Sequence, residues 1–111
     1  MMEYLELLIM LIGSHFICDY VLQTDAIATG KNRLIDPCKF GVHWCYWMTS
    51  HAVTHGFGVG IITGSVWLGF FEFVSHWFID AGKCEKQYGL HVDQVLHLAC
   101  KVWIVYFYMA T

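Results

Sequence analysis

The chain has 111 residues, of which 58% are hydrophobic and only 14% are charged, and its mean hydropathy is +0.53. This composition is far more apolar than that of an average soluble domain and favours a membrane protein. The net charge of -3, with no run of basic residues, excludes the electrostatic pattern of a nucleic-acid-binding protein.

The first predicted helix, residues 4–28, carries a histidine and an aspartate four positions apart, His15 and Asp19. This spacing places both side chains on one face of a helix, one turn apart. The segment reaches the roughly 20 residues that cross a bilayer core, which predicts a transmembrane helix. It has no basic start and no small-residue cleavage site, so it is not expected to be a signal peptide.

The second predicted helix, residues 44–63, repeats the spacing of four with His51 and His55. Three glycines follow at the same spacing: Gly56, Gly60 and Gly64. Such small residues allow the backbone of another helix to approach closely, either within the chain or from a second copy of it. This glycine stripe is the predicted contact of a homo-oligomer.

The third predicted helix, residues 66–83, carries His76 and Asp80, again four apart, and ends in Lys83. Lys83 lies three residues after Asp80, where its ammonium group could neutralise charge on a bound substrate. The alternative for Lys83 is an anchor that extends from the inner end of the helix to the membrane surface.

The fourth predicted helix, residues 92–110, begins with Asp93 and His97. A short repeat relates the first and third helices, because serine, histidine, an aromatic residue and an aspartate recur in the same order at 14–19 and 75–80. The pattern predicts an all-α, four-transmembrane-helix bundle built from two helical hairpins, with residues 1–111 forming a single membrane domain.

The basic residues predict the orientation of this bundle. Five of the six lie in two connections on the same side of the predicted bundle: Lys31, Arg33, Lys39, Lys83 and Lys86. By the positive-inside rule this side faces the cytoplasm, which leaves both termini on the non-cytoplasmic side. The expected location is the inner (cytoplasmic) membrane, with several passes through the lipid bilayer. Lys31 is expected at the surface, with contact to a substrate as the lesser alternative.

On this topology the four polar pairs converge at one depth, in the half of the bundle nearest the cytoplasm. An aspartate at the centre of a membrane helix costs about 2.5–3.5 kcal/mol, and a hydrogen bond between membrane helices returns only about 0.6–2 kcal/mol. Structural zinc contributes about 10–16 kcal/mol in small peptides. A shared metal site is therefore predicted, with eight ligands: His15, Asp19, His51, His55, His76, Asp80, Asp93 and His97.

The residue types of these eight ligands favour one or two divalent transition-metal ions. Imidazoles with carboxylates suit zinc first and manganese or iron next, whereas calcium and magnesium prefer all-oxygen shells. The alternative is a hydrogen-bonded polar core or a proton pathway that holds no metal.

The order and spacing of the polar residues also resemble a known family. The motif consists of His15, Asp19, Leu22, Gln23, Lys31, His51, His55, His76, Asp80, Lys83, Asp93, Gln94 and His97. Over nearly the whole chain it resembles the domain-of-unknown-function family 3307, which implies a small membrane protein of bacteria or their phages. That family has no settled activity. Its histidine and aspartate pattern is in turn similar to that of membrane-bound metal-dependent hydrolases, by analogy.

These observations predict a metal-dependent hydrolase that acts on a lipid-linked or membrane-proximal substrate. The ions would lower the pKa of a bound water toward about 7, an aspartate such as Asp80 or Asp93 would bridge them or act as the base, and Lys83 would neutralise charge. Two ions favour a phosphoester, although an amide or a carboxyl ester stays open.

Non-enzymatic functions form the rival hypothesis. A transporter is disfavoured, because the outer halves of the predicted helices are nearly devoid of ionisable residues. A phage-type effector would bind a host membrane protein through Gly56, Gly60 and Gly64, with the metal only stabilising a small bundle.

Overall fold

The computed structural model describes residues 2–110 and is all-helical over that range. Its elements are the helices α1 (Tyr4–Phe16), α2 (Asp25–Gly30), α3 (Trp44–Thr63), α4 (Val66–Cys84) and α5 (Leu90–Ala110), a π-helical segment η1 (Ile17–Val21) and a 3-10 turn η2 (Lys39–Gly41). The all-α class follows the helical periodicity of the sequence.

The prediction of four transmembrane helices is wrong. Among residues 2–110, only the stretch Tyr4–Val21 is long and apolar enough to cross a membrane by length and composition, with a mean hydropathy of 1.4 over 18 residues. The physical reason is that α3, α4 and α5 carry polar side chains along their inward faces, which lower the mean hydropathy of each helix. The predicted orientation, with both termini on the non-cytoplasmic side, loses its basis with the four spans.

The first predicted helix, residues 4–28, is divided into two. Helix α1 continues into η1, where Leu22 N donates to Ile17 O at 2.9 Å in the i to i-5 pattern of a π-helix. The chain then leaves the helix, and α2 begins after Thr24, whose Oγ1 accepts a hydrogen bond from Ile27 N. Helix α2 packs against α3 and brings the start of the following connection to the interior.

The hairpin of α3 and α4 depends on glycines. Gly64 ends α3 with a left-handed φ of 69°, a conformation that favours glycine. Farther along the hairpin, a Cβ on Gly69 would lie 2.7 Å from Gly56 O, so the two backbones are in direct contact. Gly56 of the predicted oligomer stripe therefore packs within the chain, and an oligomer through that stripe stays a prediction.

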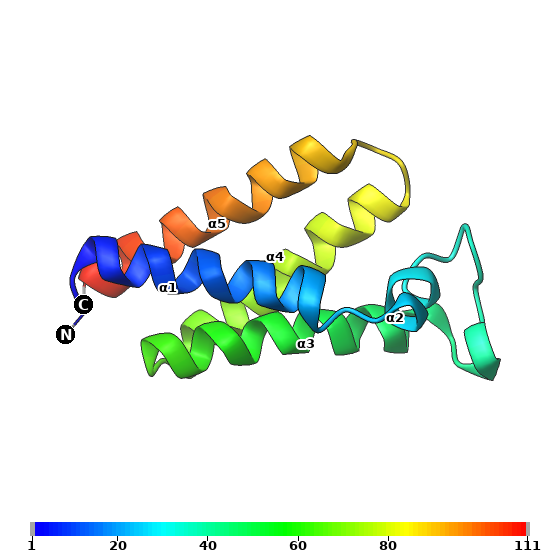
Figure 1. Cartoon of the computed structure of the whole chain (residues 1–111), viewed down its shortest axis with the longest axis horizontal. Coiled ribbons are helices and arrows are strands. Elements are labelled where there is room, and N and C mark those ends of the chain that lie inside the picture. Colours follow the sequence, from blue (N-terminus) through cyan, green and yellow to red (C-terminus); the bar gives the residue numbers. More distant parts are fainter. Residues whose placement is uncertain (1, 111) are drawn as a thin grey trace.

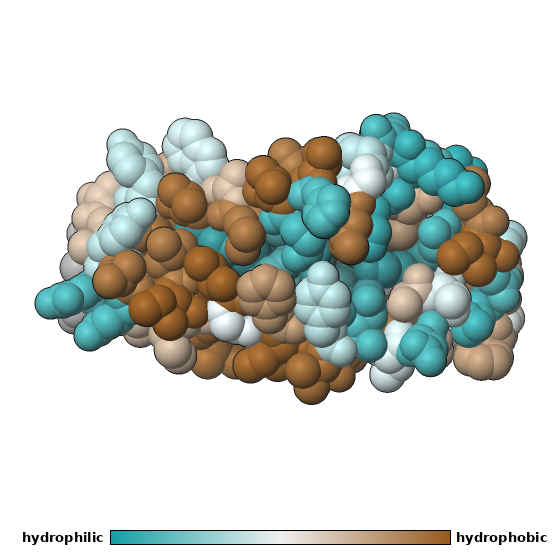
Figure 2. Space-filling view, turned by 45° about the horizontal axis from the view of Figure 1, so that its top comes forward, coloured by the Kyte–Doolittle hydropathy of each residue, from teal (hydrophilic) through white to brown (hydrophobic). Residues whose placement is uncertain are grey.

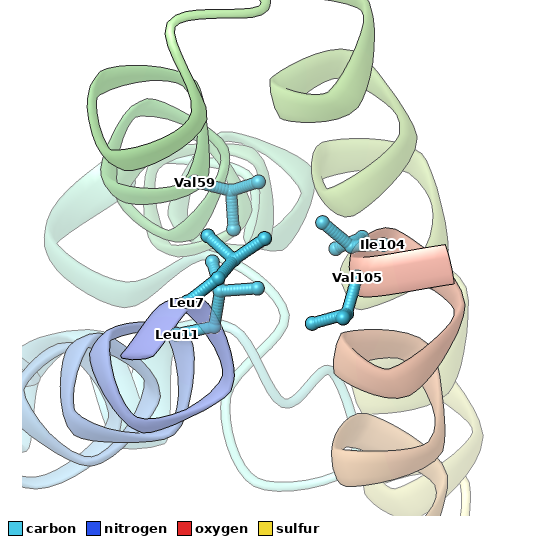
Figure 3. Close-up of a cluster of buried hydrophobic side chains, with 5 residues drawn as sticks. All are labelled: Leu7, Leu11, Val59, Ile104 and Val105. Carbon is cyan, nitrogen blue, oxygen red and sulfur yellow. The ribbon is translucent and has the colours of Figure 1, made fainter. Parts of the chain in front are cut away.

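The four longer helices enclose a common interior in which α1 contacts α3 and α5, and α4 contacts the same two helices. Figure 1 shows that the two termini lie at one end of the elongated molecule, with α2 and the α4–α5 connection at the other. At the end with the termini, five side chains form an apolar core: Leu7, Leu11, Val59, Ile104 and Val105 (Figure 3). Burial of each stabilises the fold by about 1.5–3 kcal/mol.

The interior changes from apolar to polar along each helix at steps of four residues. On α1 and η1 the inward positions are Leu7, Leu11, His15 and Asp19, of which the first three are buried. On α5 the buried inward positions are Asp93, His97, Lys101 and Val105. Because the helices are antiparallel neighbours, their polar ends meet at the same level. This arrangement positions the candidate site beside the apolar core.

Candidate metal centre

Asp19 lies at the middle of the first group of polar side chains. Its Oδ1 is 3.1 Å from His51 Nε2, 2.9 Å from His55 Nε2 and 3.8 Å from His76 Nε2. The π-helical segment places Asp19 where α3 and α4 can both reach it. Three imidazole nitrogens therefore converge on one carboxylate oxygen from two neighbouring helices.

Gln94 connects this group with the start of α5. Its Nε2 donates to Asp19 Oδ2 at 3.1 Å and to Asp93 Oδ2 at 3.0 Å, while its Oε1 accepts from His15 Nε2 at 2.9 Å. His97 Nε2 lies 3.3 Å from Asp93 Oδ1. The amide thus fixes two carboxylates relative to one another, which is the role of a residue that orients ligands.

The structure brings all eight predicted ligands together. Their candidate ligand atoms form three overlapping groups in which all lie within 4.8 Å of one another: Asp19, His51, His55 and His76; His15, His76 and His97; Asp80, Asp93 and His97. His76 and His97 each belong to two groups, and the His76 ring stacks between those of His55 and His97 at centroid distances of 3.6 and 4.1 Å. We call these eight residues the polar centre.

Among residues 2–110, the lysine that forms an ion pair with the polar centre is Lys31, and the predicted role of Lys83 stays a prediction. No ion pair joins Lys83 to another residue within 2–110, whereas Lys31 forms a buried ion pair with Asp80 Oδ2. Lys31 is only 5% exposed, so the expectation that it lies at the surface is wrong. The preceding residue, Gly30, packs closely on Trp47, since a Cβ on Gly30 would lie 2.7 Å from the ring. This contact holds the backbone at Lys31 close to α3.

A second buried ion pair, between Glu72 of α4 and Lys101 of α5, was not predicted from the sequence. Glu72 is fully buried and Lys101 is 1% exposed. The signal was present in the sequence, because Glu72 lies four residues before His76 and Lys101 four residues after His97. Extending the spacing of four by one step on each helix would have found both residues.

Several buried atoms of the polar centre lack a hydrogen-bond partner within the described residues. They are both ring nitrogens of His76 and of His97, Nδ1 of His15 and Oδ1 of Asp93. Burial lowers the pKa of His55 to about 3 and the pKa of His76 well below its ordinary value, which keeps both imidazoles neutral. Neutral imidazoles with free lone pairs are the form that binds metal ions.

Only two of the four acidic side chains in this region pair with a lysine. Asp80 and Glu72 each pair with a lysine, whereas Asp19 and Asp93 have no lysine partner within residues 2–110. Asp19 is instead hydrogen-bonded to His51, His55 and Gln94, and Asp93 to Gln94. A buried carboxylate is costly when no cation lies beside it, and a divalent ion between Asp19 and Asp93 would supply the positive charge. The donor set and the charge therefore both fit a metal ion.

The polar centre lies beneath an apolar exterior. Figure 2 shows hydrophilic residues in a furrow between ridges of hydrophobic side chains. Of the eight residues only Asp19 is not fully buried, and its side chain is 12% exposed. The edge of the centre beside η1 is thus its most exposed part.

The fold and the site define an all-helical protein with a buried histidine and aspartate centre. Residues 7–111 match the family "Protein of unknown function (DUF3307)", and the chain belongs to this family. No curated protein and no solved structure matches the chain.

Proposed function

We propose that the polar centre binds one or two divalent transition-metal ions and that the protein is a metal-dependent hydrolase. The observation that carries this proposal is the convergence of five imidazoles and three carboxylates in three overlapping groups. The buried atoms without a hydrogen-bond partner support it, as do the two carboxylates that have no lysine partner within residues 2–110. Zinc suits these ligands best, followed by manganese and iron.

A bound ion of this kind supplies Lewis-acid polarisation of an ester and lowers the pKa of water to about 7. The chain itself provides a proton acceptor in Asp93, whose buried Oδ1 has no hydrogen-bond partner within residues 2–110. Asp80 is fixed by Lys31, which takes the place predicted for Lys83 as the positive charge beside the centre. Gln94 and the histidines around Asp19 keep that carboxylate in place.

The proposed substrate is a lipid-linked or membrane-proximal phosphoester, and the proposed location is a membrane. Large apolar side chains are exposed on each longer helix, among them Ile9, Phe57, Trp67 and Trp103. Extensive exposed apolar surface is typical of proteins that contact lipid or another protein. Overlapping metal-ligand groups favour a phosphoester, because two ions together stabilise its attacking and leaving oxygens.

The burial of the ligands supports a second candidate function, in which the metal only stabilises the bundle. His76 is fully buried and His97 is 1% exposed, as in structural sites that are closed to substrate. Such a protein would act through its outer surface and would have no hydrolytic activity.

Hydrolysis by the metal-loaded protein tests the proposal. The wild type, purified in detergent and loaded with zinc or manganese, is assayed on bis(p-nitrophenyl) phosphate and on phosphatidylglycerol in mixed micelles. We expect turnover that chelation abolishes and that Asp93→Asn reduces by at least about 100-fold, the contribution of a general base. His91→Ala is the matched control, because His91 is an exposed histidine on the same helix.

Two outcomes separate the candidates. If chelation stops turnover while the circular dichroism spectrum keeps its helical signal, the hydrolase is supported. If the loaded wild type turns over neither phosphoesters, carboxyl esters nor amides, and chelation unfolds it, the metal has only a structural role.

A further inference from the structure

The Glu72–Lys101 ion pair occupies an unusual position, at the boundary between the polar centre and the apolar core. Both side chains are at most 1% exposed, and Lys101 lies three residues before Ile104 and four before Val105 on α5. Removing two charges from water costs several kcal/mol per ion, and replacing a buried ion pair by apolar residues of similar volume is often neutral or stabilising. Fold stability alone therefore does not explain this pair.

The contacts of Glu72 indicate what the pair does. Its Oε1 accepts from Lys101 Nζ and lies 3.6 Å from His76 Nδ1, one helical turn along α4. Its Oε2 lacks a hydrogen-bond partner within residues 2–110, and so does His76 Nδ1. A carboxylate oxygen and a ring nitrogen that both lack a partner thus belong to side chains on adjacent turns of one helix.

We propose that Glu72, held by Lys101, is a positioning residue for His76, and this proposal rests on the metal centre proposed above. Glu72 accepts a hydrogen bond from His76 Nδ1 and fixes the tautomer whose unprotonated Nε2 lies 3.8 Å from Asp19 Oδ1. Because His76 belongs to two of the three ligand groups, its orientation affects both. Metal-ligating histidines typically donate their second nitrogen to such a carboxylate, and its loss weakens metal binding about 10–100-fold.

Paired substitutions separate positioning from stability. In Glu72→Leu/Lys101→Met the ion pair is replaced by apolar side chains, whereas Glu72→Gln/Lys101→Met removes the charges and keeps a carbonyl oxygen that can accept from Nδ1. Zinc affinity is measured by competition with a chromogenic chelator, and the ligand field by the visible spectrum of the cobalt-loaded protein. Helix content is followed by circular dichroism. Ile104→Val, in the adjacent apolar core, is the control for a general packing defect.

We expect the Leu/Met variant to stay helical, to bind zinc about 10–100-fold more weakly and to show an altered cobalt spectrum. The Gln/Met variant should recover most of the affinity, and Ile104→Val should keep the wild-type affinity and spectrum. Wild-type affinity and an unchanged spectrum in the Leu/Met variant would overturn the positioning role.

The tautomer of His76 can also be measured directly. This second test uses only the wild type, so it does not depend on whether a variant folds. Nitrogen-15 NMR of the metal-free wild type should show the proton on Nδ1, and a proton on Nε2 would overturn the proposal. If the wild type binds neither zinc nor cobalt, the proposed function fails. The tautomer then still decides whether Glu72 orients His76.

Discussion

Lys31 shows how one side chain sets the charge at the edge of the polar centre. It reaches Asp80 from the connection after α2 and is almost completely buried there. Breaking a buried ion pair by removing one partner leaves the other charge without compensation, which is more costly than the loss of a surface pair. Lys31 should therefore matter far more than Lys83.

Substitution of the two lysines tests this difference. In the metal-free protein, Lys31→Met should lower the free energy of unfolding by about 3–5 kcal/mol, because Asp80 is left buried and unpaired. Lys83→Met should cost less than about 1 kcal/mol. The measurement is denaturant unfolding in detergent followed by circular dichroism, and equal effects of the two substitutions would contradict the assigned ion pair.

For individual residues, the sequence predicted which side chains face the interior but not which residues they contact there. The spacing of four identified His76 and Asp80 as neighbours on one helix face, because helical geometry alone decides that relation. Lys31 lies in a connection, whose path no periodicity specifies. Its role depends on the close contact between Gly30 and Trp47, which only the folded chain defines.

At the scale of elements, the contact between α3 and α4 fixes the spacing of two ligand-bearing helices. Gly69 of α4 lies against the backbone of α3 at Gly56 and Gly60. The close approach brings His51 and His55 of α3 to His76 of α4. The sequence indicated that glycines permit such contact, but it could not decide between a neighbour in the chain and a second subunit.

An added methyl group tests this contact. Gly69→Ala should lower the free energy of unfolding by about 1–3 kcal/mol, because the Cβ would lie 2.7 Å from Gly56 O and the backbones would have to separate. Gly13→Ala is the control on α1, where a Cβ has no described neighbour within 4 Å. That substitution should stabilise the helix by about 0.5–1 kcal/mol. Unfolding curves showing no loss for Gly69→Ala would refute the close approach.

The spacing of residues in the sequence predicted one helix over residues 4–28, and this prediction was wrong. A continuous helix over residues 4–28 would have carried Asp19 and Gln23 along a regular helix face. The π-helical turn adds a residue to the helix and alters the direction of the side chains that follow. Helical propensity does not predict such a turn, since it depends on the contacts that Asp19 makes with α3 and α5.

At the scale of the whole molecule, composition overestimated the number of membrane spans. The apolar side chains of α3, α4 and α5 were counted without regard to the face on which they lie. In the folded chain their inward faces carry charged and polar side chains beside the apolar core, while many of their apolar side chains are exposed. The molecule thus encloses polar groups beneath an apolar exterior, and its folding should depend on the protonation of those groups.

Acid should destabilise the metal-free protein through its buried histidines. The ordinary histidine pKa is 6.5, and the folded pKa of His55 is about 3, so below pH 6.5 the unfolded chain binds a proton that the folded chain does not. For His55 alone, the free energy of unfolding should fall by about 2 kcal/mol between pH 6.5 and 5. His55→Gln should flatten this dependence, and substitution of the exposed His91 should not. A flat wild-type profile would contradict neutral burial.

The metal content of the purified protein decides whether the polar centre binds an ion. The wild type, His76→Ala and His91→Ala are purified in detergent without chelator, dialysed against zinc and analysed for metal per chain. We expect stoichiometric transition metal in the wild type and in His91→Ala, and its loss in His76→Ala. A wild type that stays free of metal, or a His76→Ala protein that retains the full content, would contradict the metal centre.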